Sequence, residues 1–167
     1  MNNLTPFFLI LILLLLVLIV ILNRKLSQMK EIEKKQWTRA ESNVATKKML
    51  IYWMENRIQV NQIVNYLHTH NIKRIAIYGM TDIGIMFYHI LSNTDVEVVS
   101  CIDRSKKSIN LPVQIVRPKG FFESVDAVVV TSIYYFSEIY DTMCRQIGGD
   151  VPILGLDEIL YEIADAN

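Results

Sequence analysis

The sequence predicts an α/β fold: a doubly wound parallel sheet in the strand order 3-2-1-4-5, preceded by helices and an N-terminal transmembrane helix. A strand, a glycine-bounded loop, a helix and a second strand follow one another over residues 73–103. Beyond them, short apolar runs alternate with helix-spaced segments, and strands joined by helical crossovers form parallel sheets with right-handed connections. An unbroken apolar run opens the chain.

That opening run predicts a membrane anchor over residues 1–23. The stretch from Leu4 to Leu22 would form a helix of about 28 Å, close to the roughly 30 Å of a hydrocarbon core. A cleaved signal peptide is the rival interpretation, but it would carry Lys or Arg before the apolar run and small residues after it. Met1-Asn-Asn precedes the run and Asn23-Arg-Lys-Leu follows it. We therefore expect an uncleaved anchor whose residues 4–22 contact membrane lipid.

Residues 24–43 are predicted to form a basic helical spacer. From Arg24 to Lys48 eight basic residues stand against three acidic ones, which leaves nine against fourteen elsewhere. Basic residues on the C-terminal side of the anchor place the rest of the chain in the cytoplasm, on a single-pass protein of the inner membrane. The spacer's apolar stripe of Leu26, Met29 and Ile32 suits either anionic lipid or a solvated helix. The acidic domain argues against nucleic acid as a partner.

Residues 44–167 are predicted to form the α/β domain. Helical spacing of apolar residues predicts a helix over 44–56 and a second one from Val60 that ends at Asn71. After the 73–103 unit we expect a polar turn, and then a regular alternation of elements. These are a strand at 111–116, a brief helix at 118–123, a strand at 126–132, a helix at 135–147, a strand at 151–156, and a terminal helix capped by Asp157 that runs through Ile163.

Metal and disulfide chemistry find little support in the sequence. Cys101 and Cys144 fall on predicted buried faces of a strand and a helix, where reduced thiols are expected. His68 and His70 lie at the tail of a helix and have no Cys or carboxylate at ligand spacing. We predict no metal site.

The loop after the first strand is the predicted phosphate-binding element. Gly79 permits a sharp turn and Gly84 lets the following helix pack closely on the strand, as the first and third glycines of a dinucleotide fingerprint do. Thr81 occupies the second place, where its Cβ would face a pyrophosphate. The loop residues Met80, Thr81, Asp82 and Ile83 present backbone N–H groups at the helix N-terminus, which is an anion site. Asp82 adds a negative charge there, or simply stabilises its own helix.

Residues that follow the second and fourth strands complete the predicted pocket. Asp103 ends the second strand, where a carboxylate can accept from ribose hydroxyls, and Arg104 comes next. Thr131, Ser132 and Tyr134 follow the fourth strand, at the crevice of an open α/β sheet. Tyr135 and Phe136 are expected to pack. Asp103 also suits an ordinary turn.

Catalytic groups are not identified by the sequence. The loop lacks the Gly-Lys-Ser/Thr of a P-loop, no serine-centred nucleophile elbow occurs, and no lysine follows Lys119 to pair with a tyrosine. A general base near the pocket would be one of four residues without an evident partner: Asp82, His89, Asp103 or Glu138. Enzymatic activity is therefore left open, with a non-catalytic role favoured.

Four segments resemble a known family: KRIAIYGMTDIG, VVSCIDRS, DAVVVTSIYYFSEI and ILGLDEIL. From Trp53 to Glu158 the chain is similar to the Rossmann-like nucleotide-binding domains of bacterial surface-polysaccharide biosynthesis proteins, which are also appended to some sugar methyltransferases and glycosyltransferases. The resemblance implies that Gly79, Gly84 and Asp103 bind a nucleotide, NAD or a nucleotide-sugar such as a UDP-sugar.

Three functions follow from these observations. The first is a membrane-anchored, cytoplasm-facing nucleotide-binding domain, accessory to polysaccharide assembly and in contact with its proteins. The second is an NAD-dependent oxidoreductase or sugar-modifying enzyme that borrows missing groups from a partner. The third is a non-catalytic interaction scaffold at the membrane.

Overall fold

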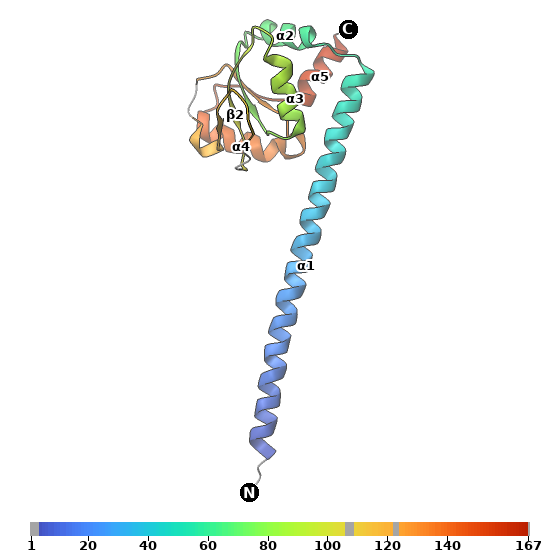
Figure 1. Ribbon diagram of the computed structural model, residues 1–167, viewed down its shortest axis with the longest axis vertical. Helices are drawn as coiled ribbons and strands as arrows, with labels where there is room; N and C mark the ends of the chain where they lie inside the picture. The colour runs from blue at the N-terminus through green and yellow to red at the C-terminus, as the bar shows by residue number, and fades with distance from the viewer. Residues whose placement is uncertain (1–3, 106–108, 122–123, 167) are drawn as a thin grey trace. The chain divides into compact units, whose positions relative to one another are not determined.

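The computed structural model describes residues 4–105, 109–121 and 124–166. The chain divides into two compact units, Met1–Glu41 and Ser42–Asn167. Its first element is the helix α1 (Leu4–Glu55), which appears in blue to cyan in Figure 1. The anchor, the spacer and the helix expected from residue 44 are thus parts of one helix. After Pro6 no glycine or proline interrupts the sequence before Glu55, so nothing in it breaks the backbone hydrogen bonding.

The N-terminal part of α1 is long and apolar enough to cross a membrane, by length and composition. Every side chain from Leu9 to Leu22 is a large aliphatic one and is exposed. A helix that is apolar on all sides could span a membrane, where lipid and not water would surround it.

The second unit contains the predicted sheet. Its strands are β1 (Arg74–Tyr78), β2 (Glu97–Ile102), β3 (Ile115–Val116), β4 (Ala127–Val130) and β5 (Ile153–Gly155). Their order is β3-β2-β1-β4-β5 and every pair is parallel, which confirms the expected topology. Tyr78 is in register with Ile102 of β2 and Val130 of β4, so these three strands end at one edge.

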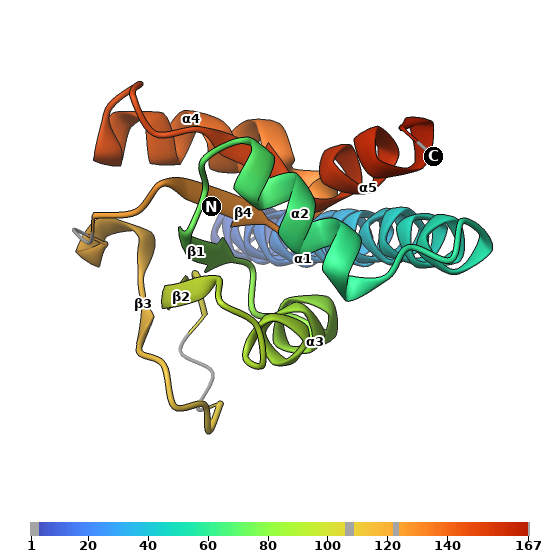
Figure 2. The ribbon, with the colours of Figure 1, turned by 90° about the horizontal axis from the view of Figure 1, so that it is seen from above.

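Helices cover both faces of this sheet. The elements are α2 (Val60–Thr69), α3 (Asp82–Leu91), α4 (Phe136–Ile147) and α5 (Leu156–Asp165). One core joins α2, α3, α5 and the end of α1 to the sheet, and the second core joins α4 to the other face. Figure 2 shows α3 and α4 on opposite sides of the strands. Burial on both faces explains the uninterrupted apolar run at residues 75–78 of β1 and throughout β4.

Several predicted boundaries differ from the structure. The strand expected at 111–116 is only Ile115–Val116, because Pro112 has no N–H for a sheet ladder and β3 is an edge strand. The helix expected at 118–123 is a 3-10 turn at Pro118–Gly120; residues 122 and 123 lie outside the described part of the chain, as do 106–108 of the expected polar turn. Cys101 is fully buried as predicted, whereas Cys144 is partly exposed.

The predicted cap of the last helix is wrong. Gly155, not Asp157, is the N-cap of α5, and Asp157 lies within its first turn. The Gly155 N–H donates to the Glu158 carboxylate at 3.4 Å, which is the backward half of a capping box. A carboxylate three residues past the cap serves here in place of a side chain at the cap.

Candidate functional site at the carboxyl edge of the sheet

A cavity of about 310 Å³ lies at the carboxyl edge of the sheet. It is lined by residues from the ends of three strands and from α4, namely Tyr78, Gly79, Asp103, Arg104, Ser132, Tyr135 and Ile139. β1 connects onward to β2 on one side and neighbours β4 on the other, so the cavity lies where the strand order reverses. Ligands of open α/β sheets bind at this switch point.

Two glycines shape the wall of this cavity. Gly79 has φ +100°, and a Cβ at this position would collide with the Ser132 hydroxyl. A Cβ on Gly84 would collide with the carbonyl oxygen of Gly79, so α3 packs directly against the loop. Thr131 is buried and donates its hydroxyl hydrogen bond to that same carbonyl at 2.6 Å. The close packing needs both glycines, as the fingerprint argument anticipates.

Asp103 holds the loop to the end of β2. Its Oδ2 accepts from the Met80 N–H at 2.8 Å, and its Oδ1 accepts from the N–H and the hydroxyl of Ser105 at 2.7 and 2.6 Å. A carboxylate has about four acceptor sites, so it can take a ribose hydroxyl as well. The turn-forming and the ligand-binding interpretations of Asp103 are therefore compatible.

Arg104 supplies the positive charge of the cavity. Its Nε donates to the Tyr78 hydroxyl at 3.2 Å, and its Nη1 pairs with the Glu138 carboxylate of α4 at 2.9 Å. Partial burial acts to lower the pKa of Arg104, but the contacts with Tyr78 and Glu138 outweigh it and raise that pKa overall. The guanidinium is thus a fixed cation that joins the ends of β1, β2 and α4.

The N-terminus of α3 presents its first turn next to the same loop. Thr81 is the N-cap and makes no side-chain cap hydrogen bond, so its hydroxyl does not satisfy the N–H groups behind it. Asp82, the first helical residue, is exposed, whereas Met80 and Ile83 are buried and belong to the core. Of the predicted loop residues, only Gly79 lines the cavity itself.

The tyrosines after β4 exchange their expected roles. Tyr134 is 40% exposed and does not line the cavity, whereas Tyr135 does. A 3-10 turn at Ile133–Tyr135 sets which of the two rings faces inward, and sequence periodicity does not reveal such a turn. The lining residues Tyr78 and Ile139 were also missed, because each reads as an ordinary apolar position of its strand or helix.

The four candidate bases do not converge. Asp103 lines the cavity and Glu138 pairs with Arg104 beside it, while Asp82 is exposed at the start of α3. His89 lies in the last turn of α3 with its ring against Tyr88, at the opposite end of that helix. Within the described residues no group of three or more His, Cys, Asp or Glu side chains is placed to hold a metal.

Comparisons with models of protein families, with curated proteins and with solved structures found no match for this chain.

Proposed function

We propose that residues 42–167 bind a phosphorylated ligand, a nucleotide or nucleotide-sugar, in the cavity at the carboxyl edge of the sheet. The observation that carries this proposal is a switch-point cavity with a fixed guanidinium, that of Arg104, in its wall. Arginine is well suited to phosphate because its planar fork donates two parallel hydrogen bonds. The Asp103 carboxylate beside it suits ribose hydroxyls.

The size of the cavity favours a mononucleotide over a full dinucleotide. Its volume of about 310 Å³ is at the small end of ligand pockets, which run from about 300 to 1,000 Å³. Thr81 stands where a dinucleotide fingerprint has its second glycine, and Met80 fills the space beneath the loop. UDP and UDP-sugars are therefore better candidates than NAD.

Binding would exchange one anion for another at Arg104. In the present arrangement the Glu138 carboxylate occupies the Nη1 edge of the guanidinium. A phosphate that binds the same edge replaces Glu138, which is 61% exposed at its side chain and free to turn into solvent. The ion pair thus holds Arg104 ready for a ligand and competes with that ligand.

The proposal assigns a binding role rather than a reaction. No described residue in the cavity lining forms a nucleophile–base pair, since Asp103 is hydrogen-bonded to its own loop and Arg104 to Glu138 and Tyr78. With the N-terminal helix as an anchor and the basic spacer on the cytoplasmic side, the domain would bring a bound nucleotide-sugar to the inner membrane. The family resemblance makes surface-polysaccharide assembly the process it serves.

Isothermal titration of the full-length protein in nonionic detergent tests the proposal, with UDP, UDP-glucose and NAD as ligands. UDP is expected to bind. Arg104→Gln should weaken it by about tenfold or more, because a charge-assisted hydrogen bond contributes about 1.5–3 kcal/mol. Glu138→Gln should leave binding equal or tighter, since it removes the competing anion. The exposed Asp141→Asn on α4 is the matched control.

Two results would overturn it. One is no saturable heat from any of the three ligands at millimolar concentration. The other is an Arg104→Gln variant that binds as Asp141→Asn does. The polysaccharide role has its own readout: cells that carry only Arg104→Gln should assemble less surface polysaccharide than cells that carry Asp141→Asn, at equal protein level.

A further inference from the structure

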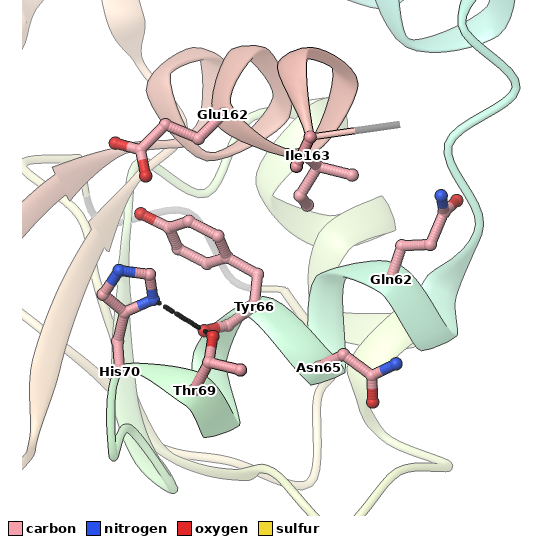
Figure 3. A pocket seen from close by; sticks show the side chains of 8 residues that line it. Gln62, Asn65, Tyr66, Thr69, His70, Glu162 and Ile163 are labelled. Atoms are coloured by element: carbon pink, nitrogen blue, oxygen red, sulfur yellow. Dashed lines mark hydrogen bonds between the residues drawn. The ribbon is translucent and has the colours of Figure 1, made fainter.

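A second pocket lies away from the nucleotide cavity, between α2 and α5. Its volume is about 400 Å³, and its lining is Gln62, Asn65, Tyr66, Thr69 and His70 on one side, with Glu162, Ile163 and Ala166 on the other. Figure 3 shows the Tyr66 ring between the Glu162 carboxylate and the His70 ring. The carboxyl-edge cavity shares none of these residues, so the two pockets are independent sites.

His70 and Thr69 each use a side-chain hydrogen-bond donor within this pocket. His70 Nδ1 lies 2.8 Å from the Tyr66 carbonyl oxygen, which can only accept, so Nδ1 carries the hydrogen. The Thr69 hydroxyl donates to the same carbonyl at 2.8 Å. The Tyr66 phenol lies beside the Glu162 carboxylate (Figure 3). The Glu162 carboxylate, which can only accept, therefore offers lone pairs to a ligand.

The electrostatic field of the pocket is negative. Among the described lining residues there is no Lys or Arg, and no ion pair between described residues involves Glu162. The last turns of α2 and α5 both contribute to the lining, and the C-terminal end of a helix carries partial negative charge. Burial, reinforced by the carboxylates of Glu162 and Glu158, raises the pKa of Tyr66 to about 12.

The aromatic rings add a further attraction for cations. The Tyr66 and His70 rings stack with their centroids 4.3 Å apart and their planes tilted by 36°. The tyrosine face bears the negative side of a π quadrupole, which attracts an ammonium group. Neither the Glu162 carboxylate nor this face suits a phosphate.

We propose that this pocket binds a small organic cation that carries a primary ammonium group. The ammonium would donate to the Glu162 carboxylate, while the alkyl chain packs against the Tyr66 ring and Ile163. A primary ammonium has three N–H donors, no acceptor and a positive charge, which complements a pocket that holds the Glu162 carboxylate and no Lys or Arg among its described lining residues. The acidic second unit of the chain would attract such a ligand from solution.

Putrescine is the probe, and uncharged butanediol of the same chain length is the matched ligand. The full-length protein in nonionic detergent is titrated with each, by calorimetry and by following the His70 ring resonances. Putrescine should bind saturably and shift those resonances, and butanediol should do neither. Glu162→Gln should weaken putrescine by about tenfold or more, as loss of a charge-assisted hydrogen bond predicts. Tyr66→Phe should weaken it less.

The control is Asp141→Asn, which removes one negative charge from the exposed face of α4 and should keep affinity within about twofold of the parent. Glu162 is exposed, and circular dichroism of Glu162→Gln checks that the variant folds. The proposal fails if butanediol binds as tightly as putrescine. It fails equally if Glu162→Gln matches Asp141→Asn, or if putrescine leaves the His70 resonances unchanged at millimolar concentration.

Discussion

Two buried hydroxyls in the sheet differ in what they contact. Ser100 on β2 is 1% exposed, and its Oγ has no hydrogen-bond partner among the described residues. Thr131 is equally buried, yet its hydroxyl donates to the carbonyl of Gly79 at 2.6 Å and lies 3.2 Å from that of Tyr78. The Ser100 hydroxyl therefore bears an uncompensated desolvation cost, whereas the Thr131 hydroxyl fixes the loop beside the cavity.

Replacing these hydroxyls should therefore change stability in opposite directions. Ser100→Ala is expected to raise the free energy of unfolding by up to about 1 kcal/mol, because it removes a buried polar group that nothing satisfies. Thr131→Val should lower it by about 1–3 kcal/mol, since it leaves a buried carbonyl without its donor. Urea unfolding of the full-length protein in detergent measures both. Changes of the same sign would contradict this account.

Asp126 gives the fold a specific pH dependence. Its Oδ2 accepts from the backbone N–H groups of Lys73 and Arg74, each at 2.8 Å, just before β1. These hydrogen bonds lower the pKa of Asp126 below the ordinary value for an aspartate side chain. A carboxyl whose pKa is lower in the folded state stabilises that state above its unfolded pKa and loses the effect as pH falls through its folded pKa.

Comparison with Asp126→Asn should reveal this dependence. The parent should be more stable than the variant at neutral pH, and the difference should shrink as the pH falls below about 4. Thermal unfolding followed by circular dichroism across this range is the measurement. A difference that stays constant down to about pH 2 would assign the effect to geometry rather than to ionisation.

At the scale of elements, the contact between the β1 loop and α3 shapes the loop beside the cavity at the carboxyl edge of the sheet. Gly84→Ala places a methyl group against the Gly79 carbonyl oxygen, which belongs to the backbone and cannot turn away. We expect a loss of about 1–3 kcal/mol in stability, as overpacking usually costs, and weaker UDP binding because the loop must shift. The control is Gly149→Ala, since nothing lies within 4 Å of its Cβ position. Equal unfolding midpoints for the two variants would contradict the expected contact.

Which elements form was largely predictable from local sequence. β1, β4 and α4 follow from their apolar runs and helical spacing, and the sheet order follows from the alternation of strands and helices. The errors fall where local patterns conflict or compete. Pro112 limits β3 to two residues, and Glu158 allows Gly155 rather than Asp157 to be the N-cap of α5. α1 continues through residue 43 because no glycine or proline interrupts the sequence there. The predicted division into anchor, spacer and domain was based on composition and did not take this into account.

For the whole molecule, the N-terminal helix should decide location. Full-length protein is expected in the membrane fraction after alkaline extraction, and a chain that starts at Asn23 should be soluble, because residues 4–22 supply the apolar length. N-terminal sequencing of the membrane-bound protein should return residues from before position 22. A mature chain that starts after Leu22 would show instead that the segment is a cleaved signal sequence.

The sequence by itself determined the class of fold, the strand order, the apolar N-terminal helix, and the strand ends at which the cavity lies, because these depend on local periodicity and connection rules. Only the tertiary structure decided which side chains meet there. The Arg104–Glu138 ion pair joins residues 34 positions apart, and the hydrogen bond between Met80 and Asp103 joins residues 23 apart. The pocket between α2 and α5 brings together residues 62–70 and 162–166, which are about 100 positions apart in the sequence. Such contacts depend on how the helices pack on the sheet, and no local pattern encodes them.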